Sequence, residues 1–360
     1  MRVTRLSIDK YRNLSNIELV PAEGVNVIFG ENGQGKTNIL ESIWLFSGAK
    51  SFRGSAFSEM LPLFEEQKRA DFTLCHHDGV RETETRIILG EKREIRQNGV
   101  NLDSFSELCG GFCCVVFSPA HLNLIKGGPA ERRKAIDTVI GQIKPRYISL
   151  LQDYQKLLLQ RNTLLKDIKF SSSLIDTLDV WDISLAKTGA MIAKTRESFV
   201  NKLIPLCKEV YDGISGGKES YDMSYSSTVS ADNEISQQVM LEMLKSSRGE
   251  DIQNGSTSIG PHRDDIIIEI NGISARSFGS QGQQRSGVLA LKLGECALMQ
   301  EVTGHAPVIL LDDVMSELDD NRRDFLLHRL EDRQIFITCC DPNQIVDVDA
   351  KFEVQKGKII

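Results

Sequence analysis

The sequence predicts an α/β protein in which a mainly parallel β-sheet carries an attached antiparallel β meander and an inserted block of helices. Three observations support this fold class. A buried strand at residues 25–29 leads through a glycine-rich loop into a helix, and a second apolar strand at residues 308–313 ends in two carboxylates. Between them, from residue 131 onward, apolar residues recur with helical spacing.

The glycine-rich loop fits the phosphate-binding pattern G-x-x-x-x-G-K-T and consists of Gly30, Glu31, Asn32, Gly33, Gln34, Gly35, Lys36 and Thr37. A strand before it and a helix after it are the context that confirms such a motif. The glycines let backbone N–H groups close around phosphates, and the helix N-terminus adds favourable partial charge. We expect Lys36 to reach the β- and γ-phosphates and the Thr37 hydroxyl to ligate Mg²⁺. The sequence therefore predicts a nucleoside triphosphate site.

The composition is that of an ordinary soluble protein, with 41% apolar and 26% charged residues in a chain of 360. No apolar run approaches the ~20 residues that cross a bilayer, and Met1 leads directly into a strand pattern, so we expect a cytoplasmic protein without a signal peptide. None of the eight cysteines forms C-x-x-C. We expect buried thiols, although metal binding by Cys109, Cys113 and Cys114 is an alternative.

The net charge of −7 is unevenly distributed along the chain. Residues 122–170 hold ten Lys or Arg and four Asp or Glu, a net charge of +6, whereas residues 301–360 hold seven and thirteen, a net charge of −6. One basic face on an acidic protein would suit nucleic acid. A solvated helix surface explains the same charges equally well.

Short strands separated by tight turns occupy residues 71–102. Asp78-Gly79, Gly90-Glu91 and Asn98-Gly99 are hairpin turn signals, which predict the antiparallel meander. Another buried strand follows at residues 115–117.

Helices are predicted from residue 131 to about 168 with a break at Pro145, over about 175–210, and over about 234–244. The longest piece, about 23 residues, would span only ~35 Å. Residues 171–173 and 249–258 suggest flexible connections. A hairpin with a type I′ turn is predicted at residues 266–275, around Asn271-Gly272.

The two acids after the 308–311 strand have distinct expected roles. Asp312 at the strand end can hold Mg²⁺ beside the phosphate loop. Asp313 can orient or deprotonate the attacking water.

A second phosphate-binding surface is predicted at residues 280–285, where Ser280 and Gly282 open a helix extending to about residue 302. One loop already surrounds the γ-phosphate, so we expect this surface to serve the nucleotide of another subunit. Ser316-Glu317-Leu318-Asp319 would lie along the same boundary.

This order of motifs resembles the RecF family, bacterial recombination-mediator ATPases of the ABC/SMC/Rad50 group. The resemblance covers essentially the whole chain. Further segments that carry it are Tyr11-Arg12-Asn13, Ser51-Phe52-Arg53, Lys126-Gly127-Gly128-Pro129, Gln160-Arg161-Asn162, and Gly260-Pro261-His262-Arg263-Asp264-Asp265.

The resemblance implies an ABC-type P-loop ATPase head with three segments. Residues 1–120 would be ATPase lobe I with the Walker A motif and the antiparallel strands. Residues 121–250 would be a helical insertion, the lobe II arm. Residues 251–360 would carry the signature, Walker B and D-loop motifs.

The resemblance also implies a function. Two ATP molecules with Mg²⁺ would be sandwiched in an ATP-dependent homodimer on gapped or double-stranded DNA. RecO and RecR would help the protein to load RecA. The resemblance also implies binding of single-stranded DNA and a link to the SOS response. Ser280, Gly282 and Gln283 would cap the partner's γ-phosphate, with Asp319 nearby. Arg12 would approach the nucleotide, although a surface salt bridge is an alternative for it.

Three departures from the ABC pattern affect these expectations. Asp313 stands where most ABC heads carry Glu, and its carboxylate is one methylene shorter, so we expect slow, DNA-stimulated ATP hydrolysis. The switch histidine is absent, which leaves Thr338 as the nearest sensor of the γ-phosphate. Ala120-His121 offers no glutamine for a Q-loop.

Other functions fit less of the chain. A transporter ATPase subunit shares the core motifs but not the helical insertion, and an SMC-like structural ATPase needs far longer arms. A small-molecule P-loop kinase would not separate Lys36 from Asp312 so widely. For DNA contact by a repair ATPase we expect the basic residues of the helical block and its approach, namely Lys126, Arg132, Arg133, Lys134, Lys144 and Arg146.

Overall fold

A parallel sheet forms the centre of the molecule, with the strand order β17-β16-β3-β15-β14-β8. The computed structural model describes residues 1–360 except 63–67, 122–123 and 232–233. The strands of this sheet are β3 (Val25–Phe29), β8 (Cys114–Phe117), β14 (Val308–Asp312), β15 (Ile335–Cys339), β16 (Ala350–Gln355) and β17 (Lys358–Ile359). Every pairing among them is parallel except that of β17 with β16.

Both faces of this sheet are covered, which is why its strands are almost continuously apolar. Ile309 and Leu311 belong to the core cluster that includes helices α4 (Leu178–Ser215) and α7 (Gln281–Thr303). Val308 and Leu310 belong to the other cluster, with α1 (Lys36–Leu45) and the antiparallel sheet. Alternate side chains of β14 thus pack into different halves of the protein.

The antiparallel sheet confirms the predicted meander and extends it to the N-terminus. Its order is β2-β1-β4-β5-β6-β7, from the strands β1 (Arg2–Tyr11), β2 (Leu14–Leu19), β4 (Ala70–His77), β5 (Glu82–Leu89), β6 (Glu94–Gln97) and β7 (Val100–Leu102). Asn98 and Gly99 both have positive φ, at 50° and 82°, as a type I′ hairpin turn requires. Short helical turns η1 (Phe57–Met60) and η2 (Phe105–Leu108) flank this sheet.

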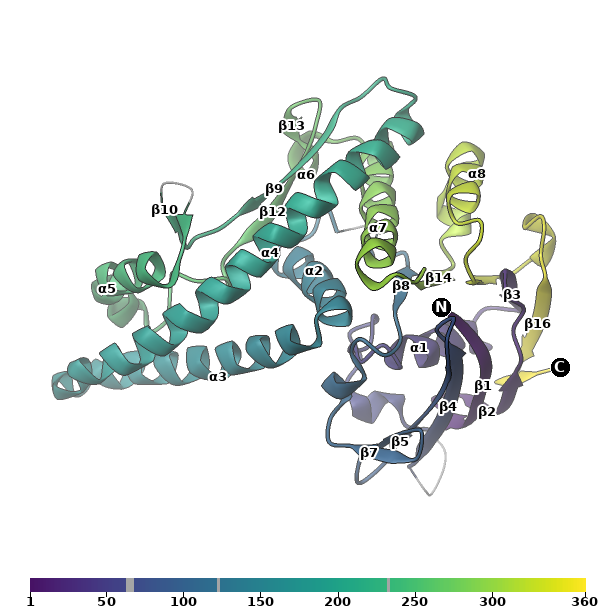
Figure 1. The fold of residues 1–360 in the computed structure, drawn as a ribbon, viewed down its shortest axis with the longest axis horizontal. Coiled ribbons are helices and arrows are strands. Elements are labelled where there is room, and N and C mark those ends of the chain that lie inside the picture. Colours follow the sequence, from purple (N-terminus) through teal and green to yellow (C-terminus); the bar gives the residue numbers. More distant parts are fainter. Residues whose placement is uncertain (63–67, 122–123, 232–233) are drawn as a thin grey trace.

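The inserted helices form an arm that projects from the head (Figure 1). They are α2 (Pro129–Ile143), α3 (Pro145–Ile168), the turn η4 (Ser172–Thr177), α4 and α5 (Gln237–Asn254). Two expectations about this block were wrong. The longest helix is α4 with 38 residues, about 57 Å, rather than 23 residues. Residues 249–254 belong to α5 rather than to a flexible connection, because buried Asp251 fixes the end of that helix.

A small sheet of order β13-β12-β9 joins the arm to the C-terminal part of the chain. It consists of β9 (Tyr221–Ser226), β12 (Asp265–Ile270) and β13 (Ile273–Ser274), and the short strands β10 (Ser230–Ala231) and β11 (Glu234–Ile235) pair separately. The predicted hairpin at Asn271-Gly272 is confirmed, but β9 was not predicted. The three-segment division stays a prediction. Strand β9 of its second segment pairs with β12 of its third, so these two segments share one sheet.

The remaining elements complete the C-terminal part: α6 (Ala275–Phe278), η5 (Met315–Glu317), α8 (Asp320–Arg329) and η6 (Pro342–Gln344). Within the described residues, no helix is both long and apolar enough to cross a membrane.

Candidate nucleotide site

A cleft of about 440 Å³ lies where the carboxyl ends of β3, β15 and β14 meet. Its lining includes Arg12, Lys36, Thr37, Asp313 and Thr338. Residues from the N-terminal and the C-terminal parts of the sequence are thus brought together at one edge of the parallel sheet. This is the edge at which α/β proteins bind ligands.

The phosphate loop needs its glycines for backbone geometry and for space. Gly30 has φ +145°, and a Cβ there would lie 2.4 Å from the Val354 carbonyl oxygen. Gly35 has φ +116°, and a Cβ there would lie 2.6 Å from a Leu14 methyl carbon. An alanine at either position would therefore strain the backbone and collide with a neighbouring strand.

Lys36 is 8% exposed and lies folded over its own loop. Its Nζ donates to the carbonyl oxygens of Gly30 (2.6 Å) and Glu31 (3.0 Å). An ammonium group in this position, beside the N-terminus of α1, is placed to exchange those carbonyls for phosphate oxygens.

The loop is also held from outside. Asn13 Nδ2 donates to the Gly33 carbonyl (3.1 Å), and the Gln34 side chain accepts the Lys356 N–H (2.6 Å). The side chain of Gln34 therefore serves the turn between β16 and β17 in this structure. Cys340 follows β15 and donates its thiol to Asn32 Oδ1 (3.2 Å).

Asp312 lies at the centre of a short hydrogen-bonded chain. Its Oδ1 accepts the Thr37 hydroxyl (2.8 Å) and the Thr338 hydroxyl (3.0 Å), and Thr338 Oγ1 in turn accepts the Asp313 N–H (2.9 Å). Burial raises the pKa of Asp312, and the two threonine hydroxyls oppose that shift by donating to its carboxylate. Thr37 and Asp312 thus present hard oxygen ligands side by side, a set that suits Mg²⁺.

Asp313 is exposed and has φ +53°, the left-handed conformation. The chain turns sharply here after β14, so Asp312 remains buried while Asp313 lines the nucleotide cleft. Aspartate tolerates this conformation better than most residues, so the backbone geometry favours an aspartate at position 313 independently of its proposed chemistry.

Arg12 is fixed by a buried carboxylate. Its Nε donates to Glu41 Oε2 (2.7 Å) and its Nη2 to Glu41 Oε1 (3.1 Å), and Glu41 is fully buried. Glu41 also accepts the hydroxyls of Tyr11 (2.8 Å) and Ser51. The surface salt bridge considered for Arg12 is therefore an ion pair with a buried partner, which holds the guanidinium at the rim of the cleft.

Arg53 lines the cleft near Arg12, although sequence reasoning gave it no role. Its Nη1 donates to Asn38 Oδ1 (2.9 Å), and its N–H to Ser51 Oγ (3.1 Å). Because Ser51 also bonds to Glu41, one buried acid holds both arginines. The segment Ser51-Phe52-Arg53 was the only sign of this residue in the sequence. The contact between Ser51 and Glu41 on α1 could not be predicted from their spacing.

Ser280, Gly282 and Gln283 are absent from the lining of this cleft and open α7 on another part of the surface. In Figure 1 the start of α7, beside α6, lies away from α1. Ser280 Oγ accepts the Gln283 N–H (3.2 Å), while Gln283 Oε1 accepts the Ser280 N–H (2.8 Å), so the two residues form a capping box. Among the residues that the structure describes, none accepts the Ser280 hydroxyl proton, whereas Gln283 Nε2 donates to Glu219 (2.7 Å).

Two arginines join this helix start to the predicted subunit boundary. Arg322 Nη2 donates to the Gly282 carbonyl (3.2 Å) and also pairs with Asp319. Arg285 donates to the Glu317 carbonyl (2.6 Å) and carboxylate (2.9 Å). Ser280 and Asp319 therefore belong to one connected surface, through contacts that no spacing in the sequence revealed.

The six residues expected to contact DNA have different environments. Lys126, Lys134, Lys144 and Arg146 are exposed. Arg132 is only 5% exposed and forms a bidentate ion pair with Asp265, both bonds 2.8 Å, so the expectation that it contacts DNA conflicts with its burial. Arg133 is half-buried and donates to the Asp264 carbonyl (2.6 Å).

The cysteines support the expectation of buried thiols. Seven of the eight are buried, and burial raises the pKa of Cys109 and of Cys113 to about 11. Across the part of the chain that the structure describes, no group of three or more His, Cys, Asp or Glu could hold a metal ion.

Comparison with known proteins agrees with this geometry. A family model described as an AAA domain matches residues 5–179. Proteins called "DNA replication and repair protein RecF" from Agathobacter rectalis and Lachnospira eligens are each 38% identical to the chain, over 100% of it and 99% of their own lengths. The chain belongs to the RecF family. The match to these DNA replication and repair proteins extends over essentially the whole length of both chains.

Solved structures extend the match from sequence to fold. The chain superposes on "the recombination mediator protein RecF-ATPrS in RecFOR pathway" with a TM-score of 0.93 and 37% identity, covering 99% of this chain and 97% of the other. The RecF-ATP structure gives 0.91 and 38%, covering 99% and 96%. An SMC head from Pyrococcus furiosus gives 0.56 at 17% identity, covering 99% and 95%, which shows the shared head fold alone.

Proposed function

We propose that this RecF-family chain is an ATP-binding switch that dimerises head to head on DNA during recombinational repair and replication restart. The observation that carries the proposal is the cleft lined by Lys36, Thr37 and Asp313, with Asp312 hydrogen-bonded to Thr37 behind it. RecF relatives solved as RecF-ATP and RecF-ATPrS support ATP as its ligand.

The protein's own groups can perform ATP hydrolysis. Lys36 and the N–H groups at the start of α1 hold the β- and γ-phosphates and offset their charge. Asp313 accepts a proton from the attacking water, since its carboxylate is exposed to the cleft. Thr37 and Asp312 would hold Mg²⁺, which when bound supplies charge neutralisation at the phosphates.

We propose slow, DNA-stimulated hydrolysis, because the shorter Asp313 reaches less far than a glutamate. ATP then acts mainly as an assembly signal. Two copies would sandwich two nucleotides, with Ser280 and Gly282 of each copy facing the other copy's γ-phosphate. The free Ser280 hydroxyl and the unpaired first N–H groups of α7 suit a phosphate oxygen. Gln283 would have to release Glu219 before it could take part.

For DNA we propose the exposed subset Lys126, Lys134, Lys144 and Arg146, with Arg133 at its edge. Arg132 is left out because its ion pair with Asp265 is buried. Such contacts bind gapped or double-stranded DNA without reading its sequence. By family, RecO and RecR are the partners in loading RecA, and the cytoplasm is the compartment.

The test is fluorescence anisotropy with labelled duplex and gapped DNA, with and without ATP. We expect ATP to increase affinity, and the triple variant Lys126→Glu/Lys144→Glu/Arg146→Glu to lose at least about tenfold. A Lys187→Glu/Lys202→Glu variant, altered at exposed lysines of α4, is the control. Unchanged affinity of the triple variant would show that the DNA surface lies elsewhere.

A further inference from the structure

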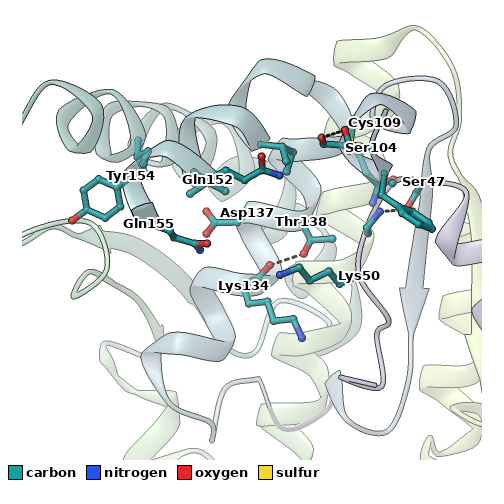
Figure 2. A pocket seen from close by; sticks show the side chains of 18 of the residues that line it. Ser47, Lys50, Ser104, Cys109, Lys134, Asp137, Thr138, Gln152, Tyr154 and Gln155 are labelled. Atoms are coloured by element: carbon teal, nitrogen blue, oxygen red, sulfur yellow. Dashed lines mark hydrogen bonds between the residues drawn. The ribbon is translucent and has the colours of Figure 1, made fainter. Parts of the chain in front are cut away.

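A cleft of about 640 Å³ lies between the arm and the antiparallel sheet, apart from the nucleotide cleft. Helices α2 and α3 form one wall, and the turn after α1 together with β6, β7 and η2 forms the other. Figure 2 shows Lys134, Thr138, Gln152 and Gln155 on the helical wall and Lys50 across from them. Arg133 and Lys134 of the proposed DNA surface also line this cleft, whereas its other lining residues have no role in the function proposed above.

Positive charge in this cleft lacks counter-charge. Lys50, Arg93 and Lys134 are exposed lining residues, and none of them has a carboxylate partner within the described part of the chain. Elsewhere the protein pairs its arginines, as in Arg86–Asp71 and Arg161–Asp182. Of the two lining carboxylates, Asp137 is already neutralised by Arg196, with both oxygens at 2.8 Å, which leaves Asp103. The cleft therefore favours an anionic ligand.

The polar lining is rich in hydrogen-bond donors and the floor is apolar. Gln152 and Gln155 can pair with base edges, and Gln142 Nε2 has no hydrogen-bond partner among the described residues. Ile148, Leu151 and Phe105 supply apolar surface. A ligand with regularly spaced negative charges and flat apolar groups matches this combination.

The size of the cleft and its position restrict the ligand further. A volume of 640 Å³ falls in the range of pockets for small organic groups, so it admits a single strand and not a base-paired duplex. Lys134 on α2 belongs to the proposed duplex-binding surface and also lines this cleft. A strand that leaves a duplex on that surface can enter the cleft directly.

We infer that this cleft holds a short stretch of single-stranded DNA next to a duplex. Phosphates lie against Lys50, Arg93 and Lys134, and unpaired bases lie over the apolar floor. The inference rests on the proposed DNA-binding function and adds a separate site for the unpaired strand of a gap.

An acidic peptide is the competing occupant. It fits less well, because the cations lie on both walls and continue the proposed DNA surface.

The experiment compares wild type with Lys50→Glu/Arg93→Glu, binding a labelled oligothymidylate or a blunt duplex in the presence of ATP. The matched control is Lys187→Glu/Lys202→Glu, which changes net charge equally. We expect the cleft variant to lose about tenfold in affinity for the single strand and less than about twofold for the duplex. The salt slope for the single strand should decrease by roughly 1.4. Photocrosslinking from thiothymidine in the oligonucleotide should label cleft residues in wild type only.

Three results would overturn the inference: no binding of the single strand by wild type, equal losses for both DNAs, or no loss for either. If wild type binds duplex but not single strands, only this inference fails; if it binds neither, the proposed function fails as well. Tighter, cleft-dependent binding of an alternating Glu-Leu peptide would identify a peptide groove instead. ATP binding by both variants, measured in parallel, should equal that of wild type.

Discussion

At the residue scale, the end of β14 separates two neighbouring acids by backbone conformation. Asp312 continues the strand and remains buried between Thr37 and Thr338, whereas Asp313 turns into the left-handed region and faces the cleft. Two identical side chains therefore have different environments and, in our proposal, different roles. Thr338 links them by bonding to both.

We predict that Asp313→Asn binds ATP but hydrolyses it at least about 100-fold more slowly, since an amide cannot accept the proton of water. Phosphate release and binding of a fluorescent ATP analogue measure the two properties. Hydrolysis at the wild-type rate would show that another group acts as the base.

We predict that Thr338→Val lowers the free energy of unfolding by about 1–3 kcal/mol, because the variant leaves the Asp313 N–H without its acceptor and removes one of the two hydroxyls that donate to the buried Asp312 oxygen. Urea unfolding measures the effect, and Thr338→Ser, which keeps the hydroxyl, should be close to wild type. Equal stability of both variants would contradict the hydrogen-bonded chain described here.

The sequence predicted residues whose partners lie within one motif, such as Lys36 and Thr37. It could not predict Glu41 or Arg322, because each acts through a residue that only the folded chain brings near. The burial of Arg132 could not be predicted for the same reason: its charge was visible in the sequence, but its partner Asp265 lies 133 residues away.

At the element scale, buried ion pairs hold the arm together. Arg161 on α3 is fully buried and donates to Asp182 on α4 and to Asp251 on α5, each at 2.7 Å. The same network explains why α5 continues through Gly249, although glycine and serine in that stretch suggested a connection. Tertiary contacts overrode local propensity there.

We predict that Arg161→Met destabilises the protein by about 3–5 kcal/mol, because it leaves Asp251 buried without its cation and removes one of the two arginines that pair with buried Asp182. Lys156→Met, on the exposed face of the same helix, should change stability by less than about 0.5 kcal/mol. Equal effects in thermal unfolding would show that the network contributes nothing specific.

The segment Gly260–Asp265 joins the arm to β12. Tyr154 donates its hydroxyl to His262 Nδ1 (2.7 Å), and His262 Nε2 donates to the Thr257 carbonyl (3.0 Å), an arrangement that needs a neutral imidazole. Burial is the main cause that lowers the pKa of His262 below 6.5; Arg263 and Arg133 lower it further, whereas the Thr257 carbonyl and Asp264 oppose the shift.

We therefore predict a stability that depends on pH. Below about pH 6.5 the unfolded chain binds more protons than the folded one, so the free energy of unfolding decreases as the pH falls. Urea midpoints measured across this range should show a smaller decrease for His262→Gln than for wild type. An identical decrease in both proteins would assign the effect to other groups.

At the scale of the whole molecule, the nucleotide cleft and the start of α7 occupy separate surfaces of one chain. In our proposal, Ser280 therefore contacts a phosphate in the cleft of another copy rather than in its own. The central claim is therefore that ATP holds two chains together, and each chain contributes half of every site.

The most direct test is sedimentation velocity of the Asp313→Asn protein with ATP, with ADP and without nucleotide, together with Ser280→Arg in the same background. The account predicts that the Asp313→Asn protein is a dimer with ATP and a monomer with ADP or without nucleotide. The protein that also carries Ser280→Arg should be a monomer under every condition but should still bind ATP. Ser280→Ala removes the same cap and hydroxyl without the bulk of arginine, so it should weaken ATP-dependent dimerisation less than Ser280→Arg does. A parent protein that stays monomeric with ATP, or a Ser280→Arg protein that dimerises, would contradict it.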